Sequence, residues 1–321
     1  MRETWKRVMV LVLTLAMMGA NTTILVQAED SVETADWMAE ISDEIPLSSI
    51  SIPGTHDSCS RFIFPGYFLQ CQNEGITTQL ENGYRYLDIR VGLDEGQDPK
   101  KLKLIHAFGT CRNEKSWFSG TLYLESVLDE VYAFLEEHPT ETVIVCVKPE
   151  SEGDDQTEVW GLLEDVLSNN SKMWYMDNAI PHLGDVRGRC VLASRFEEHQ
   201  KGMNFYWKDQ NNDYAVDIPY AVSMINTGQR LWVQDRYKYN MELKWDAFVD
   251  DLENCQADTD TFSINFLSTS GSGAWSHPAR YAEILNQKFM EYELSEDTCY
   301  GILVFDYSDE AIARKVIATN Q

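Results

Sequence analysis

The feature that most constrains the fold is a series of short apolar, β-branched segments, with helical patterns between several of them. Such segments are typical of buried strands, and strands that alternate with helices usually form a parallel sheet. We therefore predict an α/β fold, a parallel (β/α) barrel in which some helices are missing or shortened. An open doubly wound sheet is the alternative. The predicted strands cover residues 49–52, 84–91, 102–106, 142–148, 190–194, 231–234, 262–267 and 301–306.

The clearest helix is predicted over residues 123–137, where apolar residues recur at helical spacing. The dipeptide His138-Pro139 closes this helix, because proline cannot continue it. No internal repeat, linker or low-complexity segment follows residue 29, so we expect residues 29–321 to form one catalytic domain. The apolar stripe of the helix consists of Leu124, Val127, Leu128, Val131, Phe134 and Leu135, and further helices are predicted over residues 158–167, 242–254, 278–289 and 310–319.

The N-terminal segment has the layout of a secretory signal peptide. Three cations precede an apolar run over residues 8–19, and a small-x-small tripeptide ends at Ala28. The run is shorter than the roughly 20 apolar residues that span a bilayer, which counts against a membrane anchor. We predict a signal peptide over residues 1–28, cleavage after Ala28, and a soluble, secreted product.

The chain is strongly acidic, with 26 Lys and Arg against 52 Asp and Glu and a net charge of −26. This charge argues against a nucleic-acid partner and against electrostatic docking on anionic membranes. Contact with a membrane surface would therefore depend on apolar side chains. The 44% hydrophobic content excludes disorder, and we expect a monomer.

Seven cysteines in an exported chain leave at least one thiol unpaired. Cys146 and Cys190 lie in apolar strand-like segments, so we interpret both as buried thiols. Cys59, Cys71 and Cys111 fall in predicted loops, where an exported protein can form a disulfide. We expect Cys71 to pair with Cys111. No CxxC motif or histidine-rich cluster indicates a metal site.

Polar residues occur at most of the predicted strand ends. In a barrel of parallel strands the active site lies at the C-terminal ends of the strands, in the loops that follow them. So regular a placement is hard to explain as solvated surface, and it predicts a functional site there. The residues are His56, Asp57, Asp88, Arg90, His106, Lys148, Arg195, Asp235 and Asp306.

Two histidines and an arginine are the candidate catalytic core. His56 follows the dipeptide Pro53-Gly54, which we interpret as a turn after the first strand, and His106 ends the predicted third strand. Either histidine alone could equally be structural. Together with Arg90 they suit phosphoryl transfer, because one imidazole can take a proton, the other can give one, and a guanidinium can hold phosphate oxygens.

Seven segments of the chain resemble, in the same order, the X domain of bacterial phosphatidylinositol-specific phospholipases C. The resemblance covers most of residues 36–321 and implies a distorted, incomplete (β/α)8 TIM-like barrel without a metal cofactor. The segments are LSSISIPGTHDS, TTQLENGYRYLDIRV, LKLIHAFG, FLEEHPTETVIVCVKPE, GDVRGRCVLASRF, LWVQDRY and GILVFDYSDE.

The resemblance also implies a role for each matching residue. It makes His56 the general base on the inositol 2-hydroxyl and His106 the general acid toward the diacylglycerol oxygen. It makes Asp306 the group that orients the base. Asp57 works with the acid and the arginine, and Arg90 clamps the phosphate. Shorter matches assign the headgroup contacts to Lys148, Arg195, Asp235 and Tyr237.

The cationic residues favour metal-free chemistry. Related calcium-dependent animal enzymes are expected to have acidic or amide ligands where this chain has Asp57, Asp88, Arg90 and Lys148. A calcium site needs six to eight oxygen ligands, and fixed cations would repel the ion. Arg90 and Lys148 can instead stabilise the charge of the transition state directly.

The expected reaction is cleavage of phosphatidylinositol into diacylglycerol and inositol 1,2-cyclic phosphate. The 2-hydroxyl lies next to the phosphodiester, so its attack is intramolecular and has an entropic advantage. Three alternatives remain open. One is an enzyme of the same mechanism that acts on glycosyl-phosphatidylinositol anchors or another phosphodiester. The others are a metal-dependent glycerophosphodiester phosphodiesterase and a non-catalytic protein that binds inositol headgroups.

The segment 61–69 carries four aromatic residues close to the predicted catalytic turn. It could form a rim that enters the lipid interface, or a loop packed on the barrel and pinned through Cys71. Aromatic residues are more often buried than exposed to lipid, which favours the packed loop. The segments Trp117-Phe118 and 205–207 are similar candidates.

Overall fold

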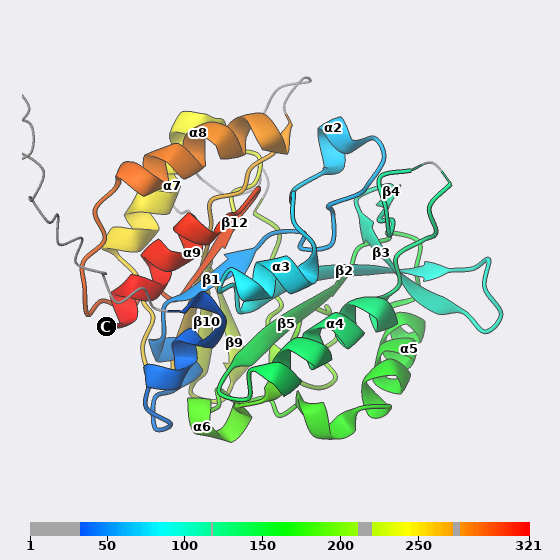
Figure 1. Cartoon of the computed structure of the whole chain (residues 1–321), viewed down its shortest axis with the longest axis horizontal. Helices are drawn as coiled ribbons and strands as arrows, with labels where there is room; N and C mark the ends of the chain where they lie inside the picture. The colour runs from blue at the N-terminus through cyan, green and yellow to red at the C-terminus, as the bar shows by residue number, and fades with distance from the viewer. Residues whose placement is uncertain (1–32, 117, 211–219, 272–276) are drawn as a thin grey trace, which may run out of the picture. The chain divides into compact units, whose positions relative to one another are not determined.

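The computed structural model describes residues 33–116, 118–210, 220–271 and 277–321. They form one mixed sheet with the strand order β6-β7-β5-β2-β1-β12-β11-β10-β9, covered by helices (Figure 1). The predicted signal peptide, residues 1–28, lies outside the described residues. Within the described ranges, no helix is long and apolar enough to cross a membrane.

The central strands of the sheet run parallel to one another, as the alternating pattern predicts. At one end the antiparallel strand β9 (Tyr220–Asn226) pairs with β10, and at the other the short strands β6 (Trp174–Tyr175) and β8 (Met203–Asn204) both pair with β7. The parallel strands are β7 (Arg189–Ser194), β5 (Thr142–Pro149), β2 (Tyr86–Asp94), β1 (Ile52–Thr55), β12 (Ile302–Phe305), β11 (Thr261–Phe266) and β10 (Gln229–Gln234).

The two ends of the sheet approach each other without closing. The side chain of Asn204 in β8 donates a hydrogen bond of 3.1 Å to the backbone oxygen of Met224 in β9. Within the described part of the chain, no ladder of backbone hydrogen bonds joins β8 to β9. The predicted incomplete (β/α) barrel is therefore confirmed.

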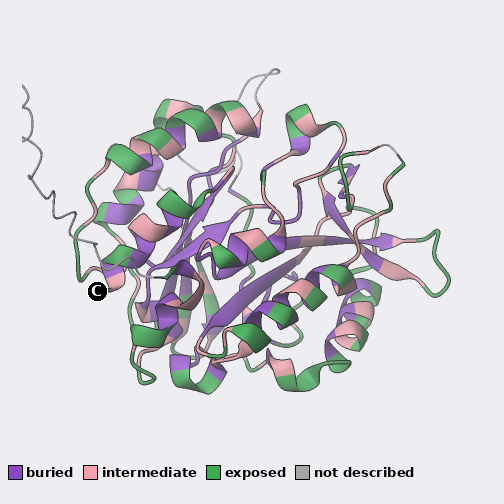
Figure 2. Cartoon of the chain, in the orientation of Figure 1, coloured by how far each residue is buried: buried purple, intermediate pink, exposed green. Residues whose placement is uncertain are grey.

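All five predicted helices are present, and their apolar faces pack on the sheet. The stripe predicted for residues 123–137 is buried along the whole of α4, where it joins the β2 and β5 side chains in one hydrophobic cluster. Figure 1 shows α4 and α5 beside β2 and β5, and α7, α8 and α9 beside β12, and Figure 2 shows that the strands are buried. The helices are η1 (Thr34–Glu40), η2 (Leu47–Ser49), α2 (Gly66–Leu69), α3 (Ile76–Glu81), α4 (Leu124–Glu137), α5 (Gln156–Ser168), η3 (Ser171–Met173), α6 (Leu183–Val186), α7 (Met241–Glu253), α8 (Pro278–Glu291), α9 (Glu310–Ile317) and η4 (Ala318–Asn320).

The prediction that residues 102–106 form a third parallel strand is wrong. The strand exists as β3 (Lys101–His106), but it runs antiparallel to β2 and forms a hairpin with it. Only residues 95–100 connect the two strands, whereas a parallel crossover needs a dozen residues or more. β4 (Gly109–Thr110) then pairs with β3. His106 therefore reaches the site from a hairpin and not from the barrel wall.

The first strand lies three residues later than predicted. Pro53 and Gly54 pair with β12 inside β1 and do not form the turn that we inferred. Gly54 is required there by close packing, because a Cβ atom at this position would lie 2.8 Å from Cδ1 of Tyr86. The chain turns at Asp57 instead, which has a positive φ of 42°.

The expected disulfide between Cys71 and Cys111 is also wrong, because all seven cysteines are free. The two thiols have different surroundings. Cys111 belongs to the hydrophobic cluster under α4, whereas the sulfur of Cys71 lies 3.8 Å from Nδ1 of His106. Cys146 and Cys190 are buried in β5 and β7, as predicted.

Candidate active site

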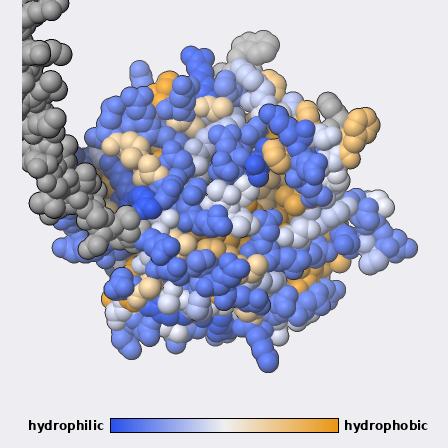
Figure 3. All heavy atoms as spheres, in the orientation of Figure 1, coloured by the Kyte–Doolittle hydropathy of each residue, from blue (hydrophilic) through white to orange (hydrophobic). Residues whose placement is uncertain are grey.

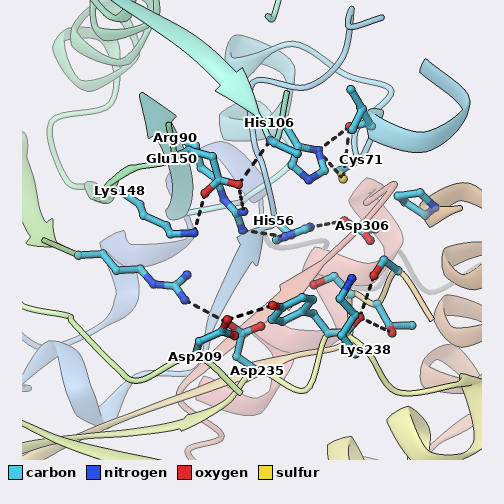
Figure 4. A pocket seen from close by; sticks show the side chains of 18 of the residues that line it. His56, Cys71, Arg90, His106, Lys148, Glu150, Asp209, Asp235, Lys238 and Asp306 are labelled. Carbon is cyan, nitrogen blue, oxygen red and sulfur yellow. Dashed lines mark hydrogen bonds and ion pairs between the residues drawn. The ribbon is translucent and has the colours of Figure 1, made fainter. Parts of the chain in front are cut away.

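A cavity of about 500 Å³ opens at the C-terminal ends of the parallel strands (Figure 4). Seven of the nine residues predicted at the strand ends line it, together with Tyr237, whereas Asp57 and Asp88 are buried and do not line it. Most of the polar residues at the predicted strand ends therefore meet in one cavity. The eight residues are His56, Arg90, His106, Lys148, Arg195, Asp235, Tyr237 and Asp306.

Two adjacent parallel strands position His56 and Asp306. Thr55 of β1 is opposite Phe305 of β12, so the residue after each strand emerges at the same level. The backbone N–H of His56 donates to the oxygen of Phe305 at 3.0 Å. The ring atom Nδ1 of His56 lies 2.7 Å from Oδ1 of Asp306. This contact fixes the ring and leaves Nε2 toward the cavity.

Asp57 lies between the two histidines. Its Oδ2 atom is 3.2 Å from Nε2 of His56 and 3.1 Å from Nε2 of His106. Its other oxygen, Oδ1, forms an ion pair with Nε of Arg90 at a distance of 2.9 Å. The two imidazole rings are 6.0 Å apart between centroids and nearly perpendicular, at 81°. The two predicted proton carriers therefore face one cavity with a single carboxylate between them.

Arg90 is the centre of the charged cluster. It extends from the middle of β2, and each of its three nitrogens contacts a carboxylate. Nε contacts the carboxylate of Asp57, Nη2 contacts the carboxylate of Asp88 at 3.1 Å, and Nη1 contacts the carboxylate of Glu150 at 3.1 Å. Its Nη2 also lies 3.0 Å from Nε2 of His56. The guanidinium is thereby held rigidly next to the imidazole, which suits a phosphate clamp.

Glu150 is a site residue that the sequence reasoning missed. Its carboxylate joins Arg90 to Lys148, whose Nζ lies 2.5 Å from Oε2. Glu150 was inside one of the segments that carried the family resemblance, but no role was assigned to it. Its position could have been inferred, because residues two apart point to the same face of a strand, and Glu150 is two residues after Lys148.

The opposite wall of the cavity holds the predicted headgroup residues. Arg195 lies 3.2 Å from the carboxylate of Asp235, and its guanidinium carbon lies 3.4 Å from the ring centroid of Trp207. The indole N–H of Trp207 donates to the same carboxylate at 3.1 Å. Trp207 is thus a buried support for Arg195, and not a lipid contact as its segment suggested. Tyr237 also lines this wall and donates to Asp209 at 3.2 Å.

The electrostatics of the cluster favour a charged His56. Burial by itself lowers the pKa of His56, but the carboxylates of Asp306 and Asp57 outweigh it and raise this pKa to about 9. Burial raises the pKa of Asp57 despite the neighbouring Arg90. Burial also acts to raise the pKa of Asp88, but the charges of Arg90, His56 and Arg195 together outweigh it and lower this pKa to about 2. Burial and the nearby Arg90 lower the pKa of Lys148.

Arg90 lies between the carboxylates of Asp57, Asp88 and Glu150. Its guanidinium occupies the space among carboxylates that could otherwise gather around a hard cation. Within the described residues, two groups could hold a softer ion, Asp57 with Cys71 and His106, and His56 with Cys71 and Asp306.

Comparison with known proteins gives a family match for part of the chain. The family model "Phosphatidylinositol-specific phospholipase C, X domain" matches residues 44–196, which contain both histidines and Arg90. Residues 44–196 of this chain are thus similar to the X domain of phosphatidylinositol-specific phospholipases C. It is 26% identical to a 1-phosphatidylinositol phosphodiesterase of Listeria monocytogenes over 91% of this chain and 87% of that protein. The protein of the same name from Staphylococcus aureus is 25% identical over 88% of this chain and 91% of that protein.

Solved structures of this family have the same fold. A phosphatidylinositol-specific phospholipase C from S. aureus superposes with a TM-score of 0.74 at 23% identity, over 91% of this chain and 99% of that one. The enzyme from L. monocytogenes gives a TM-score of 0.69 at 24% identity, over 90% and 100%. The incomplete barrel of this chain is therefore the fold of the bacterial members of the family.

Proposed function

We propose that this chain is a metal-independent phospholipase C that cleaves phosphatidylinositol to diacylglycerol and inositol 1,2-cyclic phosphate. The observation that carries the proposal is the pair of imidazoles on either side of Asp57, with the guanidinium of Arg90 fixed beside His56. Its bacterial relatives are named 1-phosphatidylinositol phosphodiesterase, which supports the substrate.

His56 is suited to be the general base. When it is neutral, its Nδ1–H donates to Asp306 and its Nε2 can accept a proton from the inositol 2-hydroxyl. The hydroxyl is then a nucleophile next to its own phosphodiester, so attack needs no second molecule. Among its neighbours, Arg90 favours this neutral form against the carboxylates of Asp306 and Asp57, because a guanidinium donates and Nε2 must then accept.

His106 is suited to be the general acid. The backbone oxygen of Leu69 accepts a hydrogen bond of 2.7 Å from Nδ1 of His106, which fixes the ring. A proton on Nε2 then lies between the ring and Asp57, 3.1 Å away, and can pass to the departing diacylglycerol oxygen. Arg90 and Lys148 supply the fixed positive charge for the transition state.

Membrane contact is a part of the proposal, and exposed aromatic side chains at the rim of the cavity support it. Tyr67 and Phe68 on α2 are 54% and 41% exposed, and Phe108, two residues past His106, is 77% exposed. The segment 61–69 is thus divided, because Ile63 and Leu69 are buried while Tyr67 and Phe68 are not. The face in Figure 3 is mostly hydrophilic with scattered apolar groups, as the net charge of −26 predicts.

Secretion, with removal of residues 1–28, remains our proposal from the sequence pattern alone. That the protein is a monomer also remains our proposal.

The test of the proposed function is release of diacylglycerol from vesicles in excess chelator. We expect turnover of phosphatidylinositol in phosphatidylcholine vesicles and none when phosphatidylinositol is replaced by phosphatidylserine, which has no hydroxyl next to the phosphate. Activity abolished by the chelator would indicate a metal-dependent enzyme. Binding of inositol headgroups without turnover would indicate a binding protein.

A further inference from the structure

The proposed reaction makes no use of Cys71, although its thiol is part of the active-site cavity. Cys71 is buried, lines the cavity, and has its sulfur 3.8 Å from Nδ1 of His106. Asp57, Cys71 and His106 each have one possible metal-ligand atom, and these three atoms lie within 4.8 Å of one another. A thiol, an imidazole and a carboxylate are the donor types that zinc takes in proteins.

The carboxylate of this group is incompletely satisfied. Oδ2 of Asp57 is buried and has no hydrogen-bond partner of good geometry, although both Nε2 atoms lie near it. In the other group that contains Cys71, His56 and Asp306 already satisfy each other at 2.7 Å. The unsatisfied oxygen therefore favours the group of Asp57, Cys71 and His106 as the place for a cation.

The ring of His106 is oriented as a metal ligand would be. Its Nδ1–H donates to the backbone oxygen of Leu69, so in the neutral ring the lone pair of Nε2 faces Oδ2 of Asp57 at 3.1 Å. A lone pair and a carboxylate repel unless a proton or a metal ion lies between them. Ligating histidines commonly donate their second nitrogen to a carbonyl in this way. Two such donors on tetrahedral zinc are about 3.3 Å apart, given bonds of about 2.1 Å.

The charge of the cluster leaves room for a cation. Formal charges at the catalytic end of the cavity sum to negative even when His56 is charged. The members are the carboxylates of Asp57, Asp88, Glu150 and Asp306 against the cations of Arg90 and Lys148.

We propose that Asp57, Cys71 and His106 form a three-ligand site for a thiophilic divalent cation such as zinc, and that the bound ion inhibits turnover. On binding, the thiol loses its proton to solvent, the sulfur and Nε2 of His106 each form a bond to the metal, and any proton on Nε2 is released. The metal then occupies the position of the acidic proton, a consequence that rests on the proposed function. Magnesium and calcium prefer oxygen ligands and are not expected to bind here.

Metal binding can be tested without any activity measurement. Titration of the chelator-treated protein with Co²⁺ should give the near-ultraviolet absorption of a cobalt–thiolate bond, and zinc should abolish it. The band should be absent in Cys71→Ser and Cys71→Ala and retained in Cys299→Ser, a control thiol that lies before β12 at the other end of the barrel. A wild-type protein without the band, or Cys71 variants that keep it, would overturn the site.

Inhibition is tested on vesicles, with each protein compared to its own activity in chelator. Zinc should inhibit the wild type and Cys299→Ser, and chelator should restore activity. The zinc concentration for half inhibition should rise by about tenfold or more in Cys71→Ser, since one ligand is lost. Equal inhibition of Cys71→Ser would overturn the proposal. If no variant shows turnover, the proposed function fails, and the cobalt band still decides the metal site.

Discussion

The contact between His56 and Asp306 is the shortest hydrogen bond of the catalytic cluster that involves a histidine and a carboxylate, at 2.7 Å from Nδ1 to Oδ1. Both residues directly follow parallel strands that are neighbours in the sheet. The contact has two consequences. It fixes the ring so that Nε2 faces Arg90, and together with Asp57 it raises the pKa of His56 to about 9 in spite of burial.

Replacement of Asp306 by asparagine should move the pH dependence of the reaction. A general base must be neutral, so kcat/KM of the wild type should rise with pH through about 9. Asp306→Asn removes one of the negative charges that hold the proton on His56, so the rise should move to lower pH by about one to two units. The measurement is kcat/KM between pH 5 and 10 for both proteins. An unchanged midpoint would show that His56 is not the group that titrates.

The same pKa makes folding stability depend on pH. The pKa of His56 is higher in the folded protein than its ordinary value of 6.5, so its contribution is complete below pH 6.5 and is lost as pH rises through about 9. The loss amounts to about 3 kcal/mol at most. Urea unfolding of wild type and His56→Gln should show that the difference between their free energies of unfolding shrinks as pH rises over this range.

A comparison with His56→Gln is needed because Lys244 titrates in the same range. Burial lowers the pKa of Lys244 to about 7, so its effect on stability has the opposite sign, increasing as pH rises from 7 to 10. This effect is present in both proteins and cancels in their difference. A difference that stays constant with pH would contradict the assignment of the raised pKa to His56.

The activities of the two histidine variants should respond differently to a better leaving group. His56→Gln and His106→Gln should each lower kcat on phosphatidylinositol by about 10²–10⁴ while the protein stays folded. A p-nitrophenyl ester of inositol phosphate has a leaving group that needs no proton. It should restore much of the activity of His106→Gln and little of that of His56→Gln. Equal recovery of both variants would contradict their separate roles.

The exposed aromatic rim should matter only on membranes. Tyr67→Ser removes an exposed ring that does not line the cavity, and it should weaken vesicle binding by roughly tenfold. Cleavage of a short-chain monomeric phosphatidylinositol should be unaffected. Met290→Ser is a matched control, because Met290 is 41% exposed at the C-terminal end of α8. Equal vesicle binding by wild type and Tyr67→Ser would remove this residue from the interface.

The sequence predicts the helices and the location of the site because both follow from short-range patterns. The stripe of α4 is a local periodicity, and it is buried along its length. Polar residues after apolar strands, such as His56, Arg195 and Asp306, meet because parallel strands end at one edge of a sheet. The family resemblance adds roles to these residues, which no property of the local pattern could assign.

The incorrect strand predictions concern which segments pair and in which direction. The strand that ends in His106 has the same apolar pattern whether it pairs parallel or antiparallel, and only the short connection 95–100 decides. The pairing of Pro53 and Gly54 with β12 depends on residues 250 positions away. The antiparallel strand β9 was missed, because Val222 and Met224 are exposed and the segment lacks a buried run on both faces.

The most direct test of the central claim is phosphorus NMR of the product formed from phosphatidylinositol in the first turnovers. Attack by the inositol 2-hydroxyl, with His56 as base and His106 as acid, predicts the signal of a five-membered cyclic phosphate before any linear inositol phosphate. A linear phosphate as the first product, with no cyclic intermediate, would mean that water attacks phosphorus directly. It would contradict the mechanism.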